Sequence, residues 1–143
     1  MYFFVEVAAF VLGYDVWFYL SHVFLHQAAL YKRIHHVHHS VNPKTMHYHD
    51  TYVAHWAEGP LQCLGVVPPV LYFGCNGSFL AAAIVLQLRG LARHDPRSTW
   101  WIGNHHLLHH KHPRYNFGEY WLDHMFGTQY PNEDEYEFGL IYI

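Results

Sequence analysis

A run of 28 residues without a formal charge, from Leu61 to Leu88, constrains the fold of this chain more than any other feature. Pro68-Pro69 interrupts the run, and Gly74-Cys75-Asn76-Gly77-Ser78 is typical of a turn. Each arm, about 61–73 and 78–89, is shorter than the ~20 residues that a helix needs to span a bilayer. We therefore expect an apolar helical hairpin that dips into a membrane, or crosses it with help from neighbouring elements. The alternative is a buried hairpin in a water-soluble protein.

The placement of basic residues favours the membrane. The segment from about Tyr2 to Tyr31 is unbroken except at Gly13 and predicts one long helix, in which Glu6 and Asp15 lower the mean hydropathy. Neither this segment nor the hairpin turn contains a Lys or Arg. All eight lie elsewhere: Lys32, Arg33, Lys44, Arg89, Arg93, Arg97, Lys111 and Arg114. If the N-terminus and the turn lie on one side of a bilayer, every basic residue lies on the other, as the positive-inside rule predicts for a cytosolic face.

Length and composition limit the remaining classes. Charged residues make up 13% of the chain, against about 25% in soluble domains, which excludes a disordered chain and a nucleic-acid-binding protein. The two cysteines, Cys63 and Cys75, are too few for a disulfide framework or a cysteine-based metal site. The 143 residues have room for one domain: a membrane helix over 1–31, the apolar hairpin over 59–93, a histidine-rich region over 94–130, and a solvated acidic tail over 131–143 without chemistry. We expect an all-α fold of membrane-embedded helices.

The chain contains 16 histidines, and their number has a chemical consequence. Protonating all of them would change the formal charge from -3 to +13, so the protein is acid-sensitive unless something keeps the rings neutral. Metal coordination is the commonest means, because a metal binds the neutral ring. The composition therefore indicates a metal site.

Three clusters of histidines are spaced like metal ligands. His22 and His26 form an i,i+4 pair on one helical face. In the segments 35–39 and 106–110, the pattern His-x-x-His-His places three rings within about a 100° arc of a helix. The eight candidate ligands are His22, His26, His35, His38, His39, His106, His109 and His110. They suffice for two metal ions with open positions for oxygen or substrate.

The other histidines are less specific. His36 and His105 lie off these arcs, so we expect them to face solvent or to support the ligands. His47 and His49 fall in an expected loop, and His112 and His124 are open as ligand, ligand support or neither.

The metal follows from ligand type, although not uniquely. Imidazole suits iron, zinc, copper and nickel. A purely structural zinc site normally has four ligands that include cysteine. A cysteine-free pair of histidine sites that faces a membrane suits two irons that activate O2 for attack on an apolar substrate.

Further motifs accompany the histidine clusters. They are Asp15-Val-Trp-Phe-Tyr19-Leu-Ser-His22, the stretch 39–43, His55-Trp56-Ala57-Glu58, Tyr115-Asn116-Phe117-Gly118 and Trp121-Leu-Asp123-His124-Met-Phe126-Gly127-Thr128. Together and in this order, over about residues 10–130, they resemble the fatty acid hydroxylase/sterol desaturase superfamily of integral membrane di-iron enzymes. Phe117 stands where tyrosine is usual in this family, Trp56 where proline is usual, and a leucine separates Trp121 from Asp123.

The resemblance implies a site and a reaction. By position, the eight rings above are ligands, and His94 is a ninth; Gly90 stands where some members carry a further histidine. Residues expected to orient ligands, or to bind metal themselves, are Asp15, His55, His105, His112, Asn116 and Asp123. The resemblance implies two iron ions (or zinc in a purified form), O2 and electrons from an external donor such as cytochrome b5. The reaction is hydroxylation or desaturation of a sterol, fatty acyl or sphingoid chain.

The expected setting is an integral membrane protein, in the endoplasmic reticulum of a eukaryotic host, with its histidine clusters on the cytosolic side. Aromatic residues that either line a lipid channel or mark the membrane interface are Tyr14, Trp17, Phe18, Tyr52 and Trp56. Family members usually carry another membrane helix or two before the first histidine box. The chain is therefore a reduced member, a fragment, or a homo-oligomer. The competing function is a non-catalytic, histidine-rich membrane protein that binds or senses metal.

Overall fold

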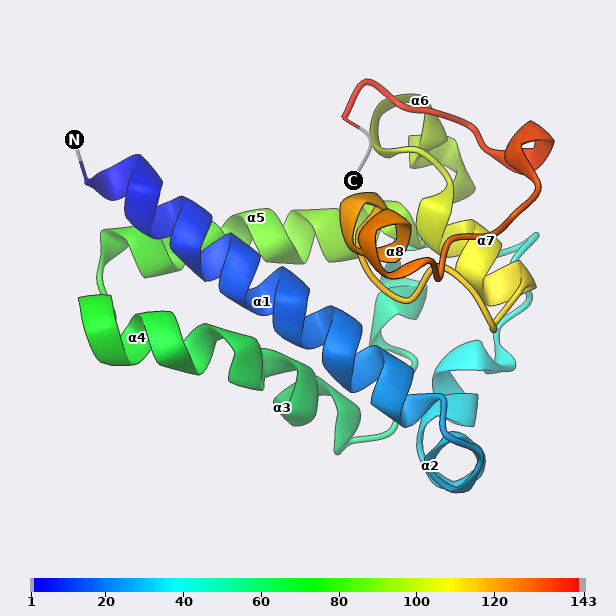
Figure 1. Cartoon of the computed structure of the whole chain (residues 1–143), viewed down its shortest axis with the longest axis horizontal. Coiled ribbons are helices and arrows are strands. Elements are labelled where there is room, and N and C mark those ends of the chain that lie inside the picture. Colours follow the sequence, from blue (N-terminus) through cyan, green and yellow to red (C-terminus); the bar gives the residue numbers. More distant parts are fainter. Residues whose placement is uncertain (1, 142–143) are drawn as a thin grey trace.

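The computed structural model describes residues 2–141, and over these residues the chain is helical and contains no strand. The prediction of an all-α fold is therefore confirmed for this part of the chain. Met1, Tyr142 and Ile143, which belong to the expected first segment and tail, lie outside the described residues. Figure 1 shows α1 (Phe3–Leu25), α4 (Val67–Phe73) and α5 (Gly77–Arg93) toward one end of the long axis, and the short helices α6 (Thr99–Ile102) and α7 (His105–Lys111) toward the other.

The longest helix, α1 (Phe3–Leu25), is the one helix in the described range that is long and apolar enough to cross a membrane. Only 22% of its most apolar stretch is buried against the rest of the protein. Leu12, Val16, Leu20 and Phe24 are exposed at i,i+4 spacing along one face. Such a face is costly in water and stable in lipid. This helix therefore indicates a membrane protein.

The prediction of a single helix as far as Tyr31 is wrong. Gln27 is extended, with ψ 135°, and a separate short helix, α2 (Ala28–Arg33), follows it. In a straight helix, His26 and His35 would lie about 14 Å apart along the axis, at a rise of 1.5 Å per residue. The break turns the chain back instead, and the two ring centroids lie 4.6 Å apart. Contacts between distant histidines thus override the local preference for a continuous helix.

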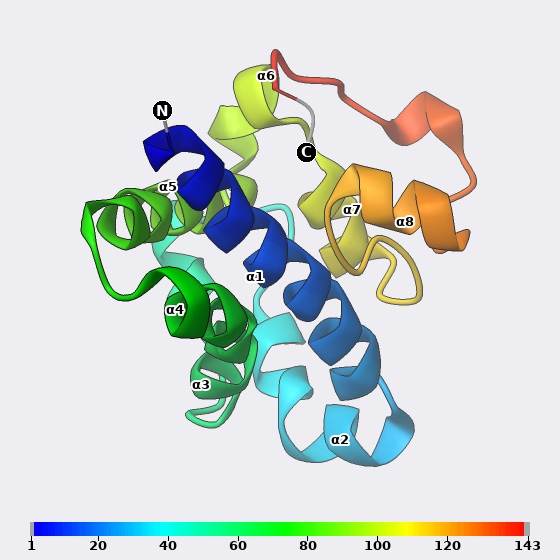
Figure 2. The ribbon, with the colours of Figure 1, turned by 60° about the vertical axis from the view of Figure 1, so that its left-hand side comes forward.

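The apolar hairpin forms, but its first arm consists of three short pieces. They are α3 (Glu58–Cys63), the 3-10 helix η3 (Leu64–Val66) and α4 (Val67–Phe73). Pro68-Pro69 lies in the first turn of α4, where proline costs no hydrogen bond. The second arm is a single helix, α5 (Gly77–Arg93), whose start is capped by Asn76. Figure 2 shows α1 lying across both arms.

Two glycines allow α1 and the first arm to touch. A Cβ atom on Gly65 would lie 2.7 Å from the Cβ atom of Trp17 and 2.8 Å from the carbonyl oxygen of Gly13. The indole of Trp17 also donates a hydrogen bond to the carbonyl of Leu61 at 2.7 Å. The first arm is therefore fixed against the middle of α1.

The N-terminal part of α1 and the hairpin turn lie at the same end of the molecule. The amide of Asn76 donates to the carboxylate of Glu6 at 2.9 Å, across 70 residues of sequence. The positive-inside interpretation of the basic residues requires that the N-terminus and the hairpin turn lie on the same side, as they do here. Which side of a membrane each end faces stays an expectation.

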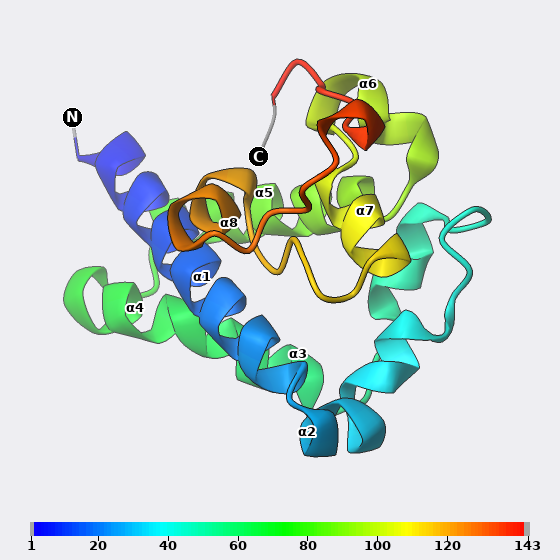
Figure 3. The ribbon, with the colours of Figure 1, turned by 45° about the vertical axis from the view of Figure 1, so that its right-hand side comes forward.

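The remaining helices are short; in Figure 3, α8 (Tyr120–Phe126) appears beside α1, α7 to the right of α8, and α6 above α7. They are the α-helices α6 (Thr99–Ile102), α7 (His105–Lys111) and α8 (Tyr120–Phe126), and the 3-10 helices η1 (His35–Ser40), η2 (Tyr48–Tyr52), η4 (Pro96–Ser98) and η5 (Glu133–Glu135). Their histidines face one another at the end of α1, and this end carries the candidate site.

The described part of the acidic tail is mostly exposed, as expected, and it also makes contacts with α7 and with the residue before it. The backbone N–H of Glu137 donates to the side chain of Asn104 at 3.0 Å, and the carbonyl of Glu137 accepts from Asn104 N–H at 3.1 Å. Glu135 forms an ion pair with Lys111. Glu133 is exposed, as expected. The tail is therefore held at both ends of α7, at Asn104 and at Lys111.

Candidate metal centre

Nine histidines gather into two groups at the C-terminal end of α1. Group A is His22, His26, His35, His39 and His109, and group B is His38, His94, His106 and His110. Within each group, one ring nitrogen from every residue lies within 4.8 Å of the others. The ring centroids of His39 and His110 are 4.7 Å apart, so the groups adjoin. These nine residues are the nine predicted ligands, and the structure brings all of them together.

The second and third histidine boxes each contribute to both groups. His39 and His109 join group A, whereas their neighbours His38 and His110 join group B. Consecutive residues on a helix point about 100° apart, so one His-His pair can serve two metal positions. Treating the three rings of a box as one face did not predict this division. The second box is also a 3-10 helix rather than the α-helix expected.

Backbone carbonyls fix the tautomer of four rings. The contacts are His22 Nδ1 to Phe117 O at 2.5 Å, His109 Nδ1 to Tyr115 O at 2.6 Å, His38 Nδ1 to Val53 O at 3.0 Å, and His94 Nδ1 to Gly90 O at 2.8 Å. A carbonyl oxygen only accepts hydrogen bonds, so each of these Nδ1 atoms donates and carries the ring proton. Each Nε2 atom therefore presents a lone pair to the interior of its group.

His38 and His94 show what this arrangement requires. Their Nε2 atoms lie 3.2 Å apart, and in the neutral rings neither atom carries a proton. Two facing lone pairs cannot form a hydrogen bond, and they repel each other unless a cation lies between them. In group A, the Nε2 atom of His26 is buried without a hydrogen-bond partner among the described residues. The donor set thus fits a transition-metal cation that prefers imidazole.

Burial keeps the rings in the form that binds metal. It lowers the pKa of His26 and His94 to about 3 and the pKa of His35 to about 4, from the ordinary value of 6.5. Burial, reinforced by His22 and other neighbouring rings, holds the pKa of His109 well below 6.5 as well. At neutral pH these rings therefore need lose no proton before a metal binds.

Glu58 lies behind a ring of group A. Its Oε1 atom is 3.0 Å from His35 Nδ1, although the ring N–H is not aligned for a hydrogen bond. The side chain is 2% exposed. A carboxylate in this position commonly orients a metal-binding imidazole. The motif that contains Glu58 did not predict this role; the signal in the sequence is a lone acid at the entrance to an uncharged hairpin.

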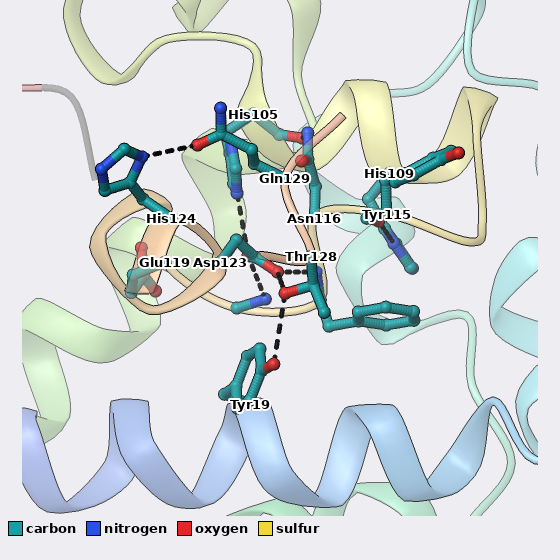
Figure 4. A network of polar contacts seen from close by, with 12 residues as sticks. Tyr19, His105, His109, Tyr115, Asn116, Glu119, Asp123, His124, Thr128 and Gln129 are labelled. Carbon is teal, nitrogen blue, oxygen red and sulfur yellow. Dashed lines mark hydrogen bonds and ion pairs between the residues drawn. The ribbon is translucent and has the colours of Figure 1, made fainter. Parts of the chain in front are cut away.

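Asp123 organises the loop that supplies two of the carbonyls (Figure 4). Its carboxylate accepts from Phe117 N–H at 2.9 Å, Gly118 N–H at 2.8 Å and the Thr128 hydroxyl at 2.6 Å, and it lies 3.0 Å from His105 Nε2. The Phe117 carbonyl in turn holds His22. Asp123 therefore acts on group A through the backbone.

The residue types at positions 116 and 118 of this loop suit its backbone conformation and its close contacts. Asn116 has φ 59°, in the left-handed region that asparagine tolerates. Its side chain donates to the His105 carbonyl at 3.1 Å and accepts from Tyr130 N–H at 2.7 Å. A Cβ atom on Gly118 would lie 2.9 Å from the ring of Tyr19. The loop is therefore fixed against both α1 and α7.

Asp15 pairs with a cation rather than with a histidine. Its Oδ2 atom accepts from Arg89 Nη1 at 3.1 Å, and beside this pair Glu119 binds Arg93. All four side chains are buried. The sequence predicts a position relative to the membrane for the two arginines, but not these ion pairs, and no role for Glu119. The i,i+4 spacing of the arginines on α5 was a signal that they share a face.

The other histidines lie outside both groups. His36 is exposed, His47 and His49 lie at the start of η2, His55 accepts from Ala57 N–H at 3.3 Å, His112 stacks on Tyr130 at 4.1 Å, and His124 lies 2.8 Å from Gln129 Oε1. None of them reaches either group of ring nitrogens.

A cavity of about 280 Å³, named the metal chamber here, opens onto both groups. Its lining includes His22 of group A and His38, His94 and His106 of group B. Four of the five aromatic residues expected at a lipid channel, Tyr14, Phe18, Tyr52 and Trp56, also line it. Trp17 points to the first arm of the hairpin instead. The site therefore has room for a small part of a substrate beside the histidines.

Comparison with known proteins gives one match. The family model described as fatty acid hydroxylase matches residues 7–128, a range that contains all nine histidines of groups A and B. The comparisons with curated proteins and with solved structures give no match. Because the family model covers most of the chain, the chain belongs to the fatty acid hydroxylase family.

Proposed function

We propose that this protein is an O2-dependent, membrane-bound di-iron enzyme that hydroxylates or desaturates a lipid: a sterol, a fatty acyl chain or a sphingoid chain. The observation that carries the proposal is the set of inward-facing imidazole lone pairs, seen most directly between His38 and His94 at 3.2 Å. Membership of the family supports an oxidoreductase of the hydroxylase or desaturase type. The apolar face of α1 supports a substrate that is taken from a membrane.

In this proposal each histidine group holds one ion. Bound iron supplies the activation of O2 toward an unactivated C–H bond. The chain supplies the rest. The carbonyls of Phe117 and Tyr115 keep the lone pairs of His22 and His109 pointed inward. The aromatic walls of the metal chamber position the substrate and limit the entry of water.

The proposed orientation of the protein in the membrane rests on the distribution of its basic residues. We propose that α1 and the hairpin lie in the membrane and that groups A and B face the cytosol, which in a eukaryotic host makes this a protein of the endoplasmic reticulum. All the basic residues lie outside the apolar arms or at their ends, which supports this orientation. An external donor such as cytochrome b5 delivers the electrons at this face.

A comparison of lipids in host cells tests the proposal. Cells that express the wild-type chain should contain a lipid with a new hydroxyl group or double bond, formed only in the presence of O2. Cells that express His109→Ala to the same level should lack it. An unchanged lipid profile from a wild-type protein that carries its full metal content would reject the enzyme. That result would favour a non-catalytic protein that binds or senses metal.

A further inference from the structure

A second cavity adjoins the metal chamber. It has a volume of about 330 Å³, is named the tail chamber here, and lies between α1, η3 and α5, with Phe10, Val66, Phe79 and Ala82 among its walls. Five residues line both cavities: Tyr14, Thr51, Tyr52, Leu86 and Gly90. The two chambers therefore meet, and one molecule can extend from the histidines into the hairpin.

One wall of the junction between the chambers is the backbone of Gly90, which faces the side chain of Thr51. A Cβ atom built on Gly90 would have Thr51 Oγ1 as its nearest neighbour, at 3.7 Å. That is an ordinary van der Waals contact, so a methyl group attached at position 90 fits against Thr51 without displacing it. A larger side chain at position 90 would extend beyond this contact into the junction that both chambers share. The carbonyl of Gly90 is occupied by His94, which fixes this wall of the passage.

The walls of the tail chamber favour an apolar occupant. They carry no formal charge, and the one amide among them, Gln87, donates to the hydroxyl of Tyr52 at 2.6 Å. In the metal chamber both arginines are neutralised. Arg89 forms an ion pair with Asp15, and Arg93 forms one with Glu119. Among the described residues of these walls, no arginine is left unpaired to attract an anionic head group inward.

We infer that one unbranched alkyl chain lies through both chambers, with its tail in the tail chamber, and that Gly90 sets the width of the passage. The inference rests on the proposed function, because it takes the metal chamber as the place of reaction. Trp56 lines the metal chamber and is 82% exposed, so it marks the mouth at which the polar head of the lipid stays. A chain held in this way presents an internal carbon to the histidine groups, whereas a fused ring system does not pass Gly90.

The two cysteines provide an internal comparison. Both are free and exposed; Cys63 lines the tail chamber, whereas Cys75 lies in the hairpin turn. The protein is placed in nanodiscs of diphytanoyl phosphatidylcholine, whose methyl-branched chains the passage excludes. Palmitate should slow the labelling of Cys63 by N-ethylmaleimide at least fivefold and leave Cys75 unchanged. Equal slowing at both thiols, or no slowing at Cys63, overturns the inference.

Variants of the passage test its width. Gly90→Leu should abolish the protection of Cys63 by palmitate, and Thr51→Leu should do so from the opposite wall. Gly90→Ala is the matched control and should behave like the wild type, because its methyl group meets Thr51 at contact distance. Full protection in both leucine variants overturns the role of the passage. Protection of Cys63 by cholesterol in the wild type overturns the selection of an unbranched chain.

Metal content and O2-dependent product, measured on the same samples, separate this inference from the proposed function. Two bound ions and an oxidised lipid without protection of Cys63 reject the channel and leave the enzyme. Protection of Cys63 in a protein without bound metal or product supports the channel and rejects the enzyme.

Discussion

The carboxylate of Asp123 is completely buried and meets two backbone N–H groups, a hydroxyl group and the ring of His105. It holds the loop whose carbonyl oxygens accept from His22 and His109. A metal-binding imidazole needs such a partner on its outer nitrogen, because that partner decides which tautomer forms and where the lone pair points. At the scale of single residues, the site therefore depends on residues that never approach the metal position.

Asp123→Ala tests this dependence. The substitution leaves buried donors at Phe117 and Gly118 without an acceptor, so we expect a loss of about 3 kcal/mol in stability. Metal content should fall as well, because His22 loses its fixed orientation. Thermal unfolding and metal analysis measure the two effects. The matched control is Asp134→Ala, which removes an exposed carboxylate and should change neither. Wild-type stability in Asp123→Ala would contradict this role.

The sequence predicts the ligands better than it predicts their partners. His22 and His26 are recognisable because i,i+4 spacing places two rings on one helical face. The carbonyl groups of Val53 and Gly90 that orient His38 and His94 carry no side-chain signal, because every residue has a carbonyl. Such partners emerge only from the folded backbone.

At the scale of elements, close contact between α1 and the first arm of the hairpin holds the scaffold of the site. A Cβ atom on Gly65 would lie 2.7 to 2.9 Å from atoms of Gly13, Tyr14 and Trp17, two of which are backbone atoms. Backbone atoms cannot rotate away as a side chain can. The crossing therefore tolerates only glycine at position 65.

Gly65→Ala should separate α1 from η3 and lower the stability by about 1–3 kcal/mol, the usual cost of overpacking. Thermal unfolding in detergent measures the change. Gly59→Ala is the control on the same arm, since a Cβ atom there meets nothing within 4 Å. It should be neutral or slightly stabilising, because alanine favours a helix more than glycine does. Equal stability in the two variants would refute the close crossing.

Local pattern predicts the existence of the helices, whereas tertiary contacts decide where they end. The hairpin and its turn agree with the sequence because Pro68-Pro69 and Asn76 act on their own neighbourhood. The break after His26 has no glycine or proline to announce it. It follows from the contact between the rings of His35 and His26 at the end of α1. The hydrophobic periodicity of the sequence does not predict a contact of this kind.

At the scale of the whole molecule, the histidines make stability depend on pH. Burial lowers the pKa of His26 and His94 to about 3, and an unfolded chain has histidines near 6.5. Below pH 6.5 the unfolded chain therefore takes up protons that the native protein does not, and the native state loses stability.

We therefore expect the metal-free protein to be most stable above about pH 6.5 and to lose about 1 kcal/mol per buried ring on acidification to about pH 5.5. Thermal unfolding of the metal-free protein across this range measures the slope. The loaded protein should release its metal over the same range, since protons compete for the ring nitrogens. A thermal unfolding temperature that rises as the pH falls from 6.5 to 5 would contradict this prediction.

Metal content per chain tests the central claim most directly, namely that each histidine group binds one ion. Elemental analysis of purified protein should give two ions per chain for the wild type and for His36→Ala, whose ring is exposed beside the site. His38→Ala removes a ligand from group B and His109→Ala removes one from group A, so each should retain about one ion. Wild-type metal content in both of these variants would contradict the account.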